Sequence, residues 1–368
     1  MPGLFDPYTL RGITLRNRIG VSPMCQYIAG TDGVPTDWHL AHLGARAVGG
    51  AALVMTEVAA VEARGRIGPG DVGIWNEAQV SAWKRITDFL RANGAVPAMQ
   101  IGHAGRKASV YQPWMGEKAL AQVPASDNGW DDVVAASGMP LRKTDKAPHE
   151  LTVPQIKALV KAFGAAADRA HRAGFDWLEM HGAHGYLMAG FLSPYSNKRT
   201  DEYGGSLENR TRFALECAAA MRAAMPERKV LAVRLSSTEF TEEGQTIENT
   251  VQVAKLLKAA GVDLIDCSAG IGAQGEGFPK VPMRPGYLVP YSERIRREAV
   301  VPTAAVGLIT EPFQAESIIR DERADLVLIG RAFLREPYWA VKAAETLGAM
   351  AGPGVAWPLP YGYAVVRR

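Results

Sequence analysis

The sequence predicts an α/β protein that folds as one (β/α)₈ barrel, the TIM-barrel architecture, over residues 1–368. Short apolar runs of strand length alternate with longer amphipathic helical patterns about eight times along the chain. The length of 368 residues suits a single barrel with its own core. The eight candidate strands cover residues 18–24, 51–57, 96–101, 175–181, 230–235, 262–267, 302–306 and 324–329.

The helix before the fourth candidate strand carries the clearest local signals. Thr152 and Gln155 form a capping-box pattern at its start, and Gly174 marks its end. Between them the apolar positions follow helical spacing at Ile156, Leu159, Val160 and Phe163. The pattern predicts an amphipathic helix that packs against a buried strand.

An open doubly wound sheet is the main alternative architecture. It would carry a glycine-rich phosphate loop after its first strand, whereas residues 23–26 are Pro-Met-Cys-Gln. A Gly-x-Gly-x-x-Gly pattern does occur at residues 270–275, but Pro279, Pro282 and Pro285 prevent a helix from following it. We interpret that pattern as a loop and favour the barrel.

Composition and charge exclude several classes of protein. The chain is 47% hydrophobic, and its net charge of +3 is spread without blocks, which argues against a nucleic-acid partner. No apolar run approaches the ~18 residues of a membrane span, and residues 1–6 do not resemble a signal peptide. Cys25, Cys217 and Cys267 are too far apart for a disulfide framework or an iron–sulfur site. We therefore expect a cytoplasmic protein with no nucleic-acid or membrane partner.

Two segments depart from the regular alternation. Residues 102–151 are rich in Pro, Gly and Trp and leave the end of the third candidate strand, where barrel enzymes keep their chemistry. We expect this segment to be an active-site capping loop in which Trp114 and Trp130 shape the choice of substrate. Residues 341–368 are expected to form a C-terminal tail.

Polar, titratable and glycine residues gather at the ends of the candidate strands. In a (β/α)₈ barrel these ends form the active-site face. A barrel built only for stability would not end its strands this way so often, so the pattern predicts an enzyme. The residues are Pro23, Met24, Cys25, Glu57, Val58, Gln100, His103, His181, His184, Arg234, Ser268, Gly307, Gly330 and Arg331.

The last two strands end in a pattern typical of phosphate binding. Gly307 and Gly330 let the backbone approach a phosphate closely, and Arg331 adds a bidentate donor. The alternative is that both glycines only form tight turns. We favour the phosphate site because both loops carry the feature.

Histidines three residues apart follow the fourth strand, at His181 and His184, with Tyr186 two residues further on. No cluster of carboxylates or thiolates accompanies them, so we expect no metal site. Either histidine alone could be a core residue with satisfied hydrogen bonds. Together they predict hydrogen-bond donors to a carbonyl or oxyanion, with Tyr186 as an acid. His39 and His42 repeat the spacing at the start of a helical pattern, and we expect them to be structural.

Taken together, these motifs resemble the Old Yellow Enzyme family of FMN-dependent ene-reductases. The likeness is greatest to its thermophilic-like branch, which includes xenobiotic reductases and bacterial NADPH dehydrogenases. It rests on a series of motifs in family order, at residues 15–19 and 22–27, 100–107, 179–187, 193–206 with 208–210, and 328–331. It implies a TIM barrel that binds FMN and takes hydride from NADPH or NADH.

The resemblance also implies roles for single residues. His181 and His184 would hold the carbonyl oxygen of an α,β-unsaturated substrate, while flavin N5 delivers hydride to Cβ and Tyr186 gives a proton to Cα. Tyr27 would reach the substrate oxygen, and the Cys25 thiol would tune the flavin. The expected cofactor-binding residues are Ser22, Pro23, Met24, Cys25 and Val58 at the flavin ring, Gln100 and Arg234 at its pyrimidine side, and Gly307, Gly330 and Arg331 at the phosphate.

The resemblance implies further contacts around the active site. Lys107 would contact the flavin or the substrate, and Arg367 or Arg368 would enter the active site of a neighbouring subunit in a homodimer or homotetramer. The 193–206 motif is expected to be a hydrogen-bonded loop rather than a catalytic one. The natural substrate is open, because enones, quinones, maleimides and nitro compounds all accept hydride from a reduced flavin.

Three other functions remain as alternatives. A tRNA dihydrouridine synthase would need a basic helical extension and a catalytic cysteine in a mid-barrel loop. A dienoyl-CoA reductase would need a cysteine cluster and further domains. A flavin-binding protein without catalysis would not need the set of His181, His184 and Tyr186.

Overall fold

A computed structural model of the chain describes residues 1–270, 280–350 and 354–365. Eight strands form a closed barrel in the order β10-β11-β12-β3-β4-β5-β8-β9, and every neighbouring pair is parallel. The predicted (β/α)₈ barrel is therefore confirmed. The barrel strands are β3 (Ile19–Val21), β4 (Leu53–Ala60), β5 (Val96–Gly102), β8 (Trp177–Gly182), β9 (Val230–Ser236), β10 (Leu264–Ser268), β11 (Thr303–Ala305) and β12 (Leu326–Ile329).

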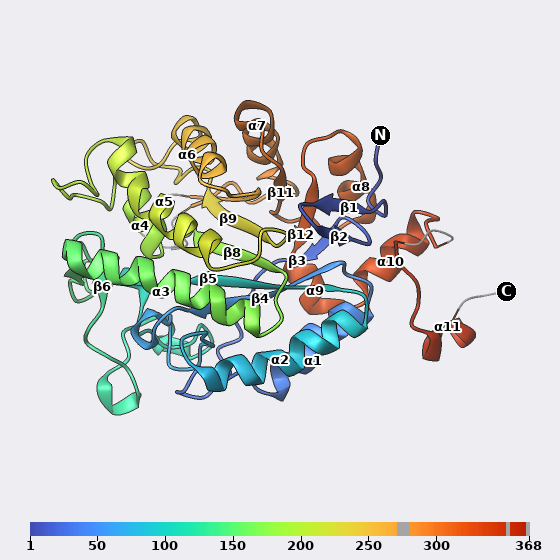
Figure 1. The fold of residues 1–368 in the computed structure, drawn as a ribbon, viewed down its shortest axis with the longest axis horizontal. Helices are drawn as coiled ribbons and strands as arrows, with labels where there is room; N and C mark the ends of the chain where they lie inside the picture. The colour runs from blue at the N-terminus through green and yellow to red at the C-terminus, as the bar shows by residue number, and fades with distance from the viewer. Residues whose placement is uncertain (271–279, 351–353, 366–368) are drawn as a thin grey trace.

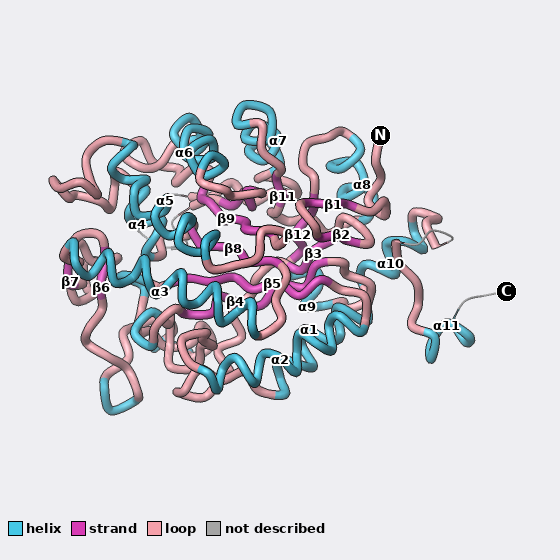
Figure 2. Tube along the Cα trace, viewed as in Figure 1, coloured by secondary structure: helices cyan, strands magenta, loops and turns pink. Residues whose placement is uncertain are grey.

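Helices surround the barrel on its outside (Figure 1; Figure 2). The 20-residue α3 illustrates why they form where they do, since Thr152 and Gln155 make the capping box that the sequence predicts. None of the helices in the described part of the chain is both long and apolar enough to cross a bilayer. The helices are α1 (Asp37–Val48), α2 (Glu77–Ala92), α3 (Val153–Arg172), α4 (Leu187–Leu192), α5 (Leu207–Ala223), α6 (Ile247–Ala259), α7 (Val289–Ala299), α8 (Pro312–Arg320), α9 (Arg331–Arg335), α10 (Trp339–Thr346) and α11 (Leu359–Val365).

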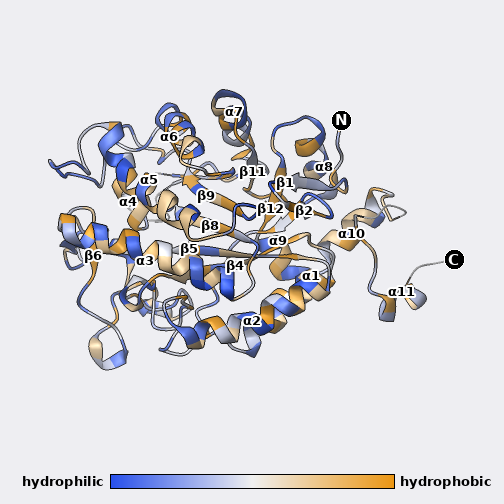
Figure 3. Ribbon diagram, in the orientation of Figure 1, coloured by the Kyte–Doolittle hydropathy of each residue, from blue (hydrophilic) through white to orange (hydrophobic). Residues whose placement is uncertain are grey.

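The hydrophobic core has two parts, as expected for a barrel inside a ring of helices. One part fills the interior of the barrel and includes Leu53, Trp177 and Leu326. The other lies between strands and helices, where Trp83 of α2 packs edge-on against Phe175 at 5.7 Å. Figure 3 shows the corresponding apolar faces of the helices turned toward the strands. This packing holds the strand ends in fixed positions.

A short antiparallel hairpin precedes the barrel and was not expected from the sequence. Its strands are β1 (Tyr8–Leu10) and β2 (Ile13–Leu15), three residues each. Ile13 and Leu15 pack against the apolar residues inside the barrel. The hairpin thus covers one end of the barrel, and Figure 1 shows it far from the loop that carries β6.

The segment 102–151 is a long excursion, as expected, with only a small sheet of β6 (Val134–Ala135) and β7 (His149–Glu150) and three short 3₁₀ turns. The loop around residue 197 is also hydrogen-bonded as expected. The Asn197 amide donates to the carbonyls of Phe191 and Tyr203, at 2.8 and 2.7 Å.

The C-terminal tail begins later than the expected residue 341. Val341 and Ala344 are buried on α10, where they pack with Val355. The chain leaves the barrel only beyond this helix, because the apolar face of α10 continues through Ala344. Figure 1 shows α11 standing apart from the rest of the molecule.

Candidate functional site

The turn after β8 brings three of the expected catalytic side chains together. His181 is the next-to-last residue of β8, and Tyr186 is the N-cap of α4. Between them His184 adopts φ +61°, a strained left-handed conformation for a residue with a side chain. The ring centroids of His181 lie 4.8 Å from Tyr186 and 5.2 Å from His184. The three rings therefore form one edge-to-face cluster at the barrel mouth.

Both histidines in this cluster are neutral imidazoles at neutral pH. Burial lowers the pKa of each ring, and the charges of Arg234 and Lys107 lower it further. The backbone N–H of Ala183 donates to His181 Nδ1 at 3.2 Å, which leaves Nε2 to carry the proton. His181 can therefore donate a hydrogen bond from Nε2.

His184 is placed differently from His181. Its Nε2 lies 2.6 Å from Ser268 Oγ. The His184 side chain also lines a cavity that Arg234 lines. In this conformation His184 Nε2 is already engaged. A hydrogen bond from that atom to a substrate oxygen requires the ring to leave Ser268.

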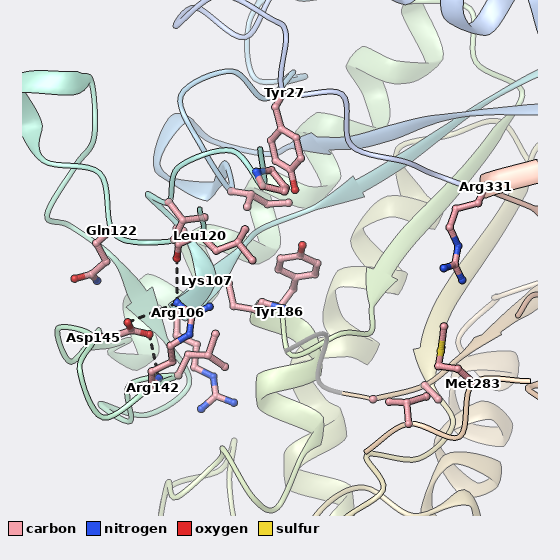
Figure 4. Close-up of a pocket in the computed structure, with 18 of the residues that line it drawn as sticks. Tyr27, Arg106, Lys107, Leu120, Gln122, Arg142, Asp145, Tyr186, Met283 and Arg331 are labelled. Carbon is pink, nitrogen blue, oxygen red and sulfur yellow. Dashed lines mark hydrogen bonds and ion pairs between the residues drawn. The ribbon is translucent and has the colours of Figure 1, made fainter. Parts of the chain in front are cut away.

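Tyr27 faces Tyr186 from the loop after β3, and the two hydroxyl groups point toward each other (Figure 4). Tyr27 has φ +54° and packs edge-on against Trp114 at 5.8 Å between ring centroids. Burial raises the pKa of both tyrosines, so both remain protonated at neutral pH. The Cys25 pKa is also raised, by burial and by the charges of Asp71 and Glu57, so its sulfur is a thiol.

A cavity of about 530 Å³ opens above these residues, beneath the 102–151 loop (Figure 4). Tyr27 and Tyr186 line one part of it, and Met283 and Arg331 lie on the opposite side. Its size is within the range of small-molecule sites. The residues of the 102–151 loop that line it are Arg106, Lys107, Ala108, Val110, Pro113, Leu120, Gln122, Leu141, Arg142 and Asp145.

Lys107 reaches the cluster of His181, His184 and Tyr186 from this loop. Its Nζ donates to the His184 carbonyl at 3.0 Å and lies 4.7 Å from the centroid of the Tyr186 ring. Burial lowers the Lys107 pKa to about 7, helped by the charges of Arg106 and Arg142. Of the two expected aromatic residues of the loop, Trp114 contacts Tyr27, whereas the Trp130 indole N–H donates to the Arg64 carbonyl at 3.1 Å.

A second cavity, of about 260 Å³, adjoins the first at Arg331. The expected phosphate residues Gly307 and Gly330 line it together with Arg234 and Arg335. No carboxylate occurs among the described residues that line this cavity. A cavity with three arginines and two glycine-bearing strand ends suits a dianionic phosphate.

Buried charges surround Arg234 inside the barrel. Its Nε lies 3.0 Å from Asp266 Oδ2, and its Nη1 donates to Ser22 Oγ at 3.5 Å. The expected pyrimidine-binding Gln100 donates to Glu179 Oε1 at 2.8 Å. Burial raises the pKa of both carboxyl groups, Glu179 and Asp266. Arg234 thus lies between Ser22 and the buried carboxyl group of Asp266.

The remaining expected residues lie around the rim of the site or outside the described chain. Pro23 and Met24 are half-buried beside Cys25, and Val58 is buried on β4 and packs in the same apolar cluster as Tyr186. Arg367 and Arg368 lie outside the described residues, as does most of the 270–275 glycine pattern.

His39 is structural, as expected, rather than part of the cavity. Its Nδ1 caps the start of α1 by accepting from the Thr36 backbone N–H at 2.9 Å, and its Nε2 lies 3.1 Å from Glu57 Oε1. No group of three or more metal-ligating side chains occurs in the part of the chain that the structure describes.

A family model described as "NADH:flavin oxidoreductase / NADH oxidase family" matches residues 3–349. The chain belongs to this family. The match covers the whole barrel and all of the motifs that resemble the Old Yellow Enzyme family. Membership establishes a flavin-dependent oxidoreductase of the Old Yellow Enzyme type, with FMN as cofactor and a reduced nicotinamide as electron donor.

Individual relatives agree with this membership. An NADPH dehydrogenase from Geobacillus sp. (strain WCH70) is 43% identical over 353 residues, which make up 96% of each chain. Morphinone reductase in complex with tetrahydroNAD has a TM-score of 0.76 at 27% identity, over 95% of this chain and 92% of that chain. A 2-naphthoyl-CoA reductase has a TM-score of 0.83 at 26% identity over 94% of this chain, which spans 52% of that longer protein.

The residues of the second cavity fit the FMN of this family. FMN carries a phosphate, and the cavity supplies Arg331 and Arg335 with the backbone at Gly307 and Gly330. Arg234 has a buried Nε with no hydrogen-bond partner of good geometry among the described residues, although Asp266 is close. A cationic side chain in this position can stabilise negative charge on a reduced flavin ring.

Sequence reasoning missed two residues that the structure places at the site. Arg335 lies four residues after Arg331 on α9, and this helical spacing could have indicated a second cation beside the phosphate. Asp71 lies in the loop between β4 and α2, beside Tyr186 in a small internal cavity. No local pattern distinguishes it from a surface loop residue.

Proposed function

We propose that this enzyme reduces the activated carbon–carbon double bond of α,β-unsaturated carbonyl compounds, with NADPH or NADH as reductant in a ping-pong cycle. When bound, FMN supplies the hydride that reaches Cβ. The observation that carries the proposal is the pairing of a neutral histidine donor with a protonated tyrosine, His181 and Tyr186, whose rings are 4.8 Å apart, with Tyr186 in the lining of the large cavity.

Each member of the pair does a different part of the chemistry. Nε2–H of His181 donates to the carbonyl oxygen and stabilises the negative charge that develops there as the double bond is reduced. Tyr186 gives its proton to Cα, since its hydroxyl is protonated at neutral pH. Tyr27 contributes a second hydroxyl from the opposite side, and His184 adds a donor when its ring leaves Ser268.

We propose cofactor-binding roles for the residues expected from the sequence. Ser22, Pro23, Met24, Cys25 and Val58 would line the flavin ring, and Gln100 with Arg234 would contact its pyrimidine side. Gly307, Gly330 and Arg331 would hold the phosphate. Lys107 would act beside Tyr186, on the substrate side. These assignments are supported by the two adjoining cavities, which meet at Arg331.

Steady-state turnover tests the proposal. The FMN-loaded enzyme is expected to oxidise NADPH when 2-cyclohexen-1-one is added and to form cyclohexanone in equal amount. Cyclohexanone itself, which has the carbonyl but no activated alkene, serves as the matched control and should cause no oxidation. NADPH oxidation by quinones alone, with no enone product, would contradict the proposal. Quinones, maleimides and nitro compounds are expected as further acceptors.

We further propose a homodimer or homotetramer in which the C-terminal segment completes a neighbouring site. The support is the exposure of α11, where Leu359 and Tyr363 are 91% and 85% exposed. Truncation after Val366, which removes Arg367 and Arg368, should raise the KM for the enone. An unchanged KM and an unchanged oligomeric state would contradict this.

The three free thiols suit a reducing compartment such as the cytoplasm.

A further inference from the structure

The proposed function requires Tyr186 to regain a proton after every turnover, and the present inference rests on that function. Tyr186 borders three cavities: the large one of about 530 Å³, a small one of about 10 Å³ that Asp71 also lines, and another of about 10 Å³ that Arg106 also lines. While a ligand fills the large cavity, a proton has to reach Tyr186 from another direction. Of the two small cavities, the one that Asp71 lines has a carboxyl group in its lining, and we call it the small cavity from here on.

The small cavity has the size and the lining of a site for one water molecule. A volume of about 10 Å³ is close to the minimum that one water needs. Asp71 and Tyr186 both line it, as do His181 and Val58. One water in this space can make hydrogen bonds to a carboxyl group and to the catalytic tyrosine.

Asp71 has one oxygen engaged and one oxygen available. Its Oδ2 accepts from the backbone N–H groups of Ile67 at 2.5 Å and Gly68 at 3.3 Å. Its Oδ1 is buried and has no hydrogen-bond partner among the described residues. The side chain is 1% exposed, so a buried polar atom of this kind calls for a partner that protein groups do not supply.

The surroundings of Asp71 favour its protonated form. Burial raises the Asp71 pKa to about 8, and the negative charge of Glu57 adds to the effect, whereas its backbone hydrogen bonds and Arg66 oppose it. A charge on Asp71 in turn raises the pKa of Tyr186. The titratable and charged groups that face Asp71 or line its cavity are Cys25, Tyr27, Glu57, Arg66, His103, His181 and Tyr186.

Other groups beside Tyr186 are less suited to return the proton. Lys107 Nζ lies 4.7 Å from the centroid of the tyrosine ring and donates to the His184 carbonyl. His181 carries its proton on Nε2, which the substrate oxygen uses. Asp71 is the carboxyl group that shares the small cavity with Tyr186 among the described residues.

We infer that Asp71 is a buried acid that returns a proton to Tyr186 through one water molecule in the small cavity. As the Cα–H bond forms, the O–H bond of Tyr186 breaks and leaves a tyrosinate. The Asp71 O–H bond then breaks, the water passes a proton on, and the tyrosine O–H bond forms again. Asp71 regains its proton from solvent, so each alkene reduced consumes one hydride and one proton.

The inference predicts that multiple turnovers and single turnovers respond differently to Asp71→Asn. Asparagine keeps an oxygen for the N–H groups of Ile67 and Gly68 but cannot supply the proton. The first oxidation of the reduced FMN enzyme by 2-cyclohexen-1-one uses the proton already on Tyr186, so its rate should change less than about twofold. Steady-state kcat at pH 7 should fall roughly tenfold to a hundredfold, so that a burst of one turnover appears.

Matched controls separate the relay from a structural effect. Asp132→Asn alters an exposed carboxylate that pairs with Arg64 at 2.7 Å, and it should leave both rates unchanged. Equal rates for wild type and Asp71→Asn would overturn the relay, and so would a parallel fall of both rates. Absence of enone turnover in the wild-type enzyme would instead refute the proposed function itself, and the relay with it.

Infrared difference spectra of the wild-type holoenzyme give a second test that needs no folded variant. The carbonyl band of a protonated carboxyl group should be lost transiently when the reduced enzyme is oxidised by the enone, and it should recover with the kinetics of turnover. A spectrum without this transient loss would overturn the inference.

Discussion

Replacing Tyr186 by phenylalanine is expected to separate the two half-reactions of the enzyme. The change removes one hydroxyl group and keeps the ring that packs against His181 at 4.8 Å and beneath Lys107 at 4.7 Å. Flavin binding and reduction by NADPH should therefore be preserved. The oxidative half-reaction with an enone should slow by about 10²–10⁴, the usual contribution of a general acid. This corresponds to about 3–5 kcal/mol of activation free energy.

Stopped-flow absorbance of the bound flavin measures both steps separately. Reduction by NADPH should have the same rate in Tyr186→Phe and in the wild type, and reoxidation by 2-cyclohexen-1-one should be slow in the variant. Tyr111→Phe is a suitable control, because that hydroxyl belongs to the capping loop and donates to exposed Asp127. If reoxidation in Tyr186→Phe stayed within about threefold of wild type, Tyr186 would not be the acid.

Three further predictions concern the scaffold around the site. Arg234→Met should lower the free energy of unfolding by about 3–5 kcal/mol, because Asp266 loses its buried partner at 3.0 Å. The same change should lower the FMN content of the purified protein, and retention of full FMN content would contradict this. Trp83→Ala should lower the free energy of unfolding, measured in urea, by about 3–5 kcal/mol, since the ring is fully buried against Phe175. The control Trp38→Ala removes a side chain that is 55% exposed and should change the free energy of unfolding by less than about 0.5 kcal/mol. The Asp71 pKa is raised to about 8, so the stability that its protonated form contributes is full below the unfolded pKa of about 4 and is lost as the pH rises through 8. Asp71→Asn should therefore gain stability relative to wild type between pH 5 and pH 8 in thermal melts, and a constant difference would contradict the raised pKa.

The sequence was sufficient to predict the barrel because its signals are local. The barrel strands are short, largely apolar runs buried on both faces, and a capping box starts α3 where Thr152 and Gln155 indicate it. The grouping of strand-end residues also follows from this, since parallel strands in a barrel end at one face. That rule brings the Gly307 and Gly330 loops to one cavity.

Features that depend on tertiary contacts could not be predicted. The β1–β2 hairpin consists of three-residue strands with mixed polarity, too short for a reliable pattern. The contact of His184 with Ser268 joins residues 84 positions apart, and the burial of Asp71 depends on three separate segments. The boundary of the tail was missed because Val341 and Ala344 are buried by Val355. Val355 lies beyond the end of α10, so the apolar spacing within that helix does not indicate the contact.

The most direct test of the account is the visible spectrum of the purified protein under anaerobic conditions. Yellow absorbance of bound FMN should bleach when NADPH is added and return when 2-cyclohexen-1-one follows, with cyclohexanone formed in proportion to the flavin reoxidised. Flavin that bleaches with NADPH but stays reduced in the presence of the enone would contradict the central claim that the His181 and Tyr186 pair directs hydride and proton to an activated alkene.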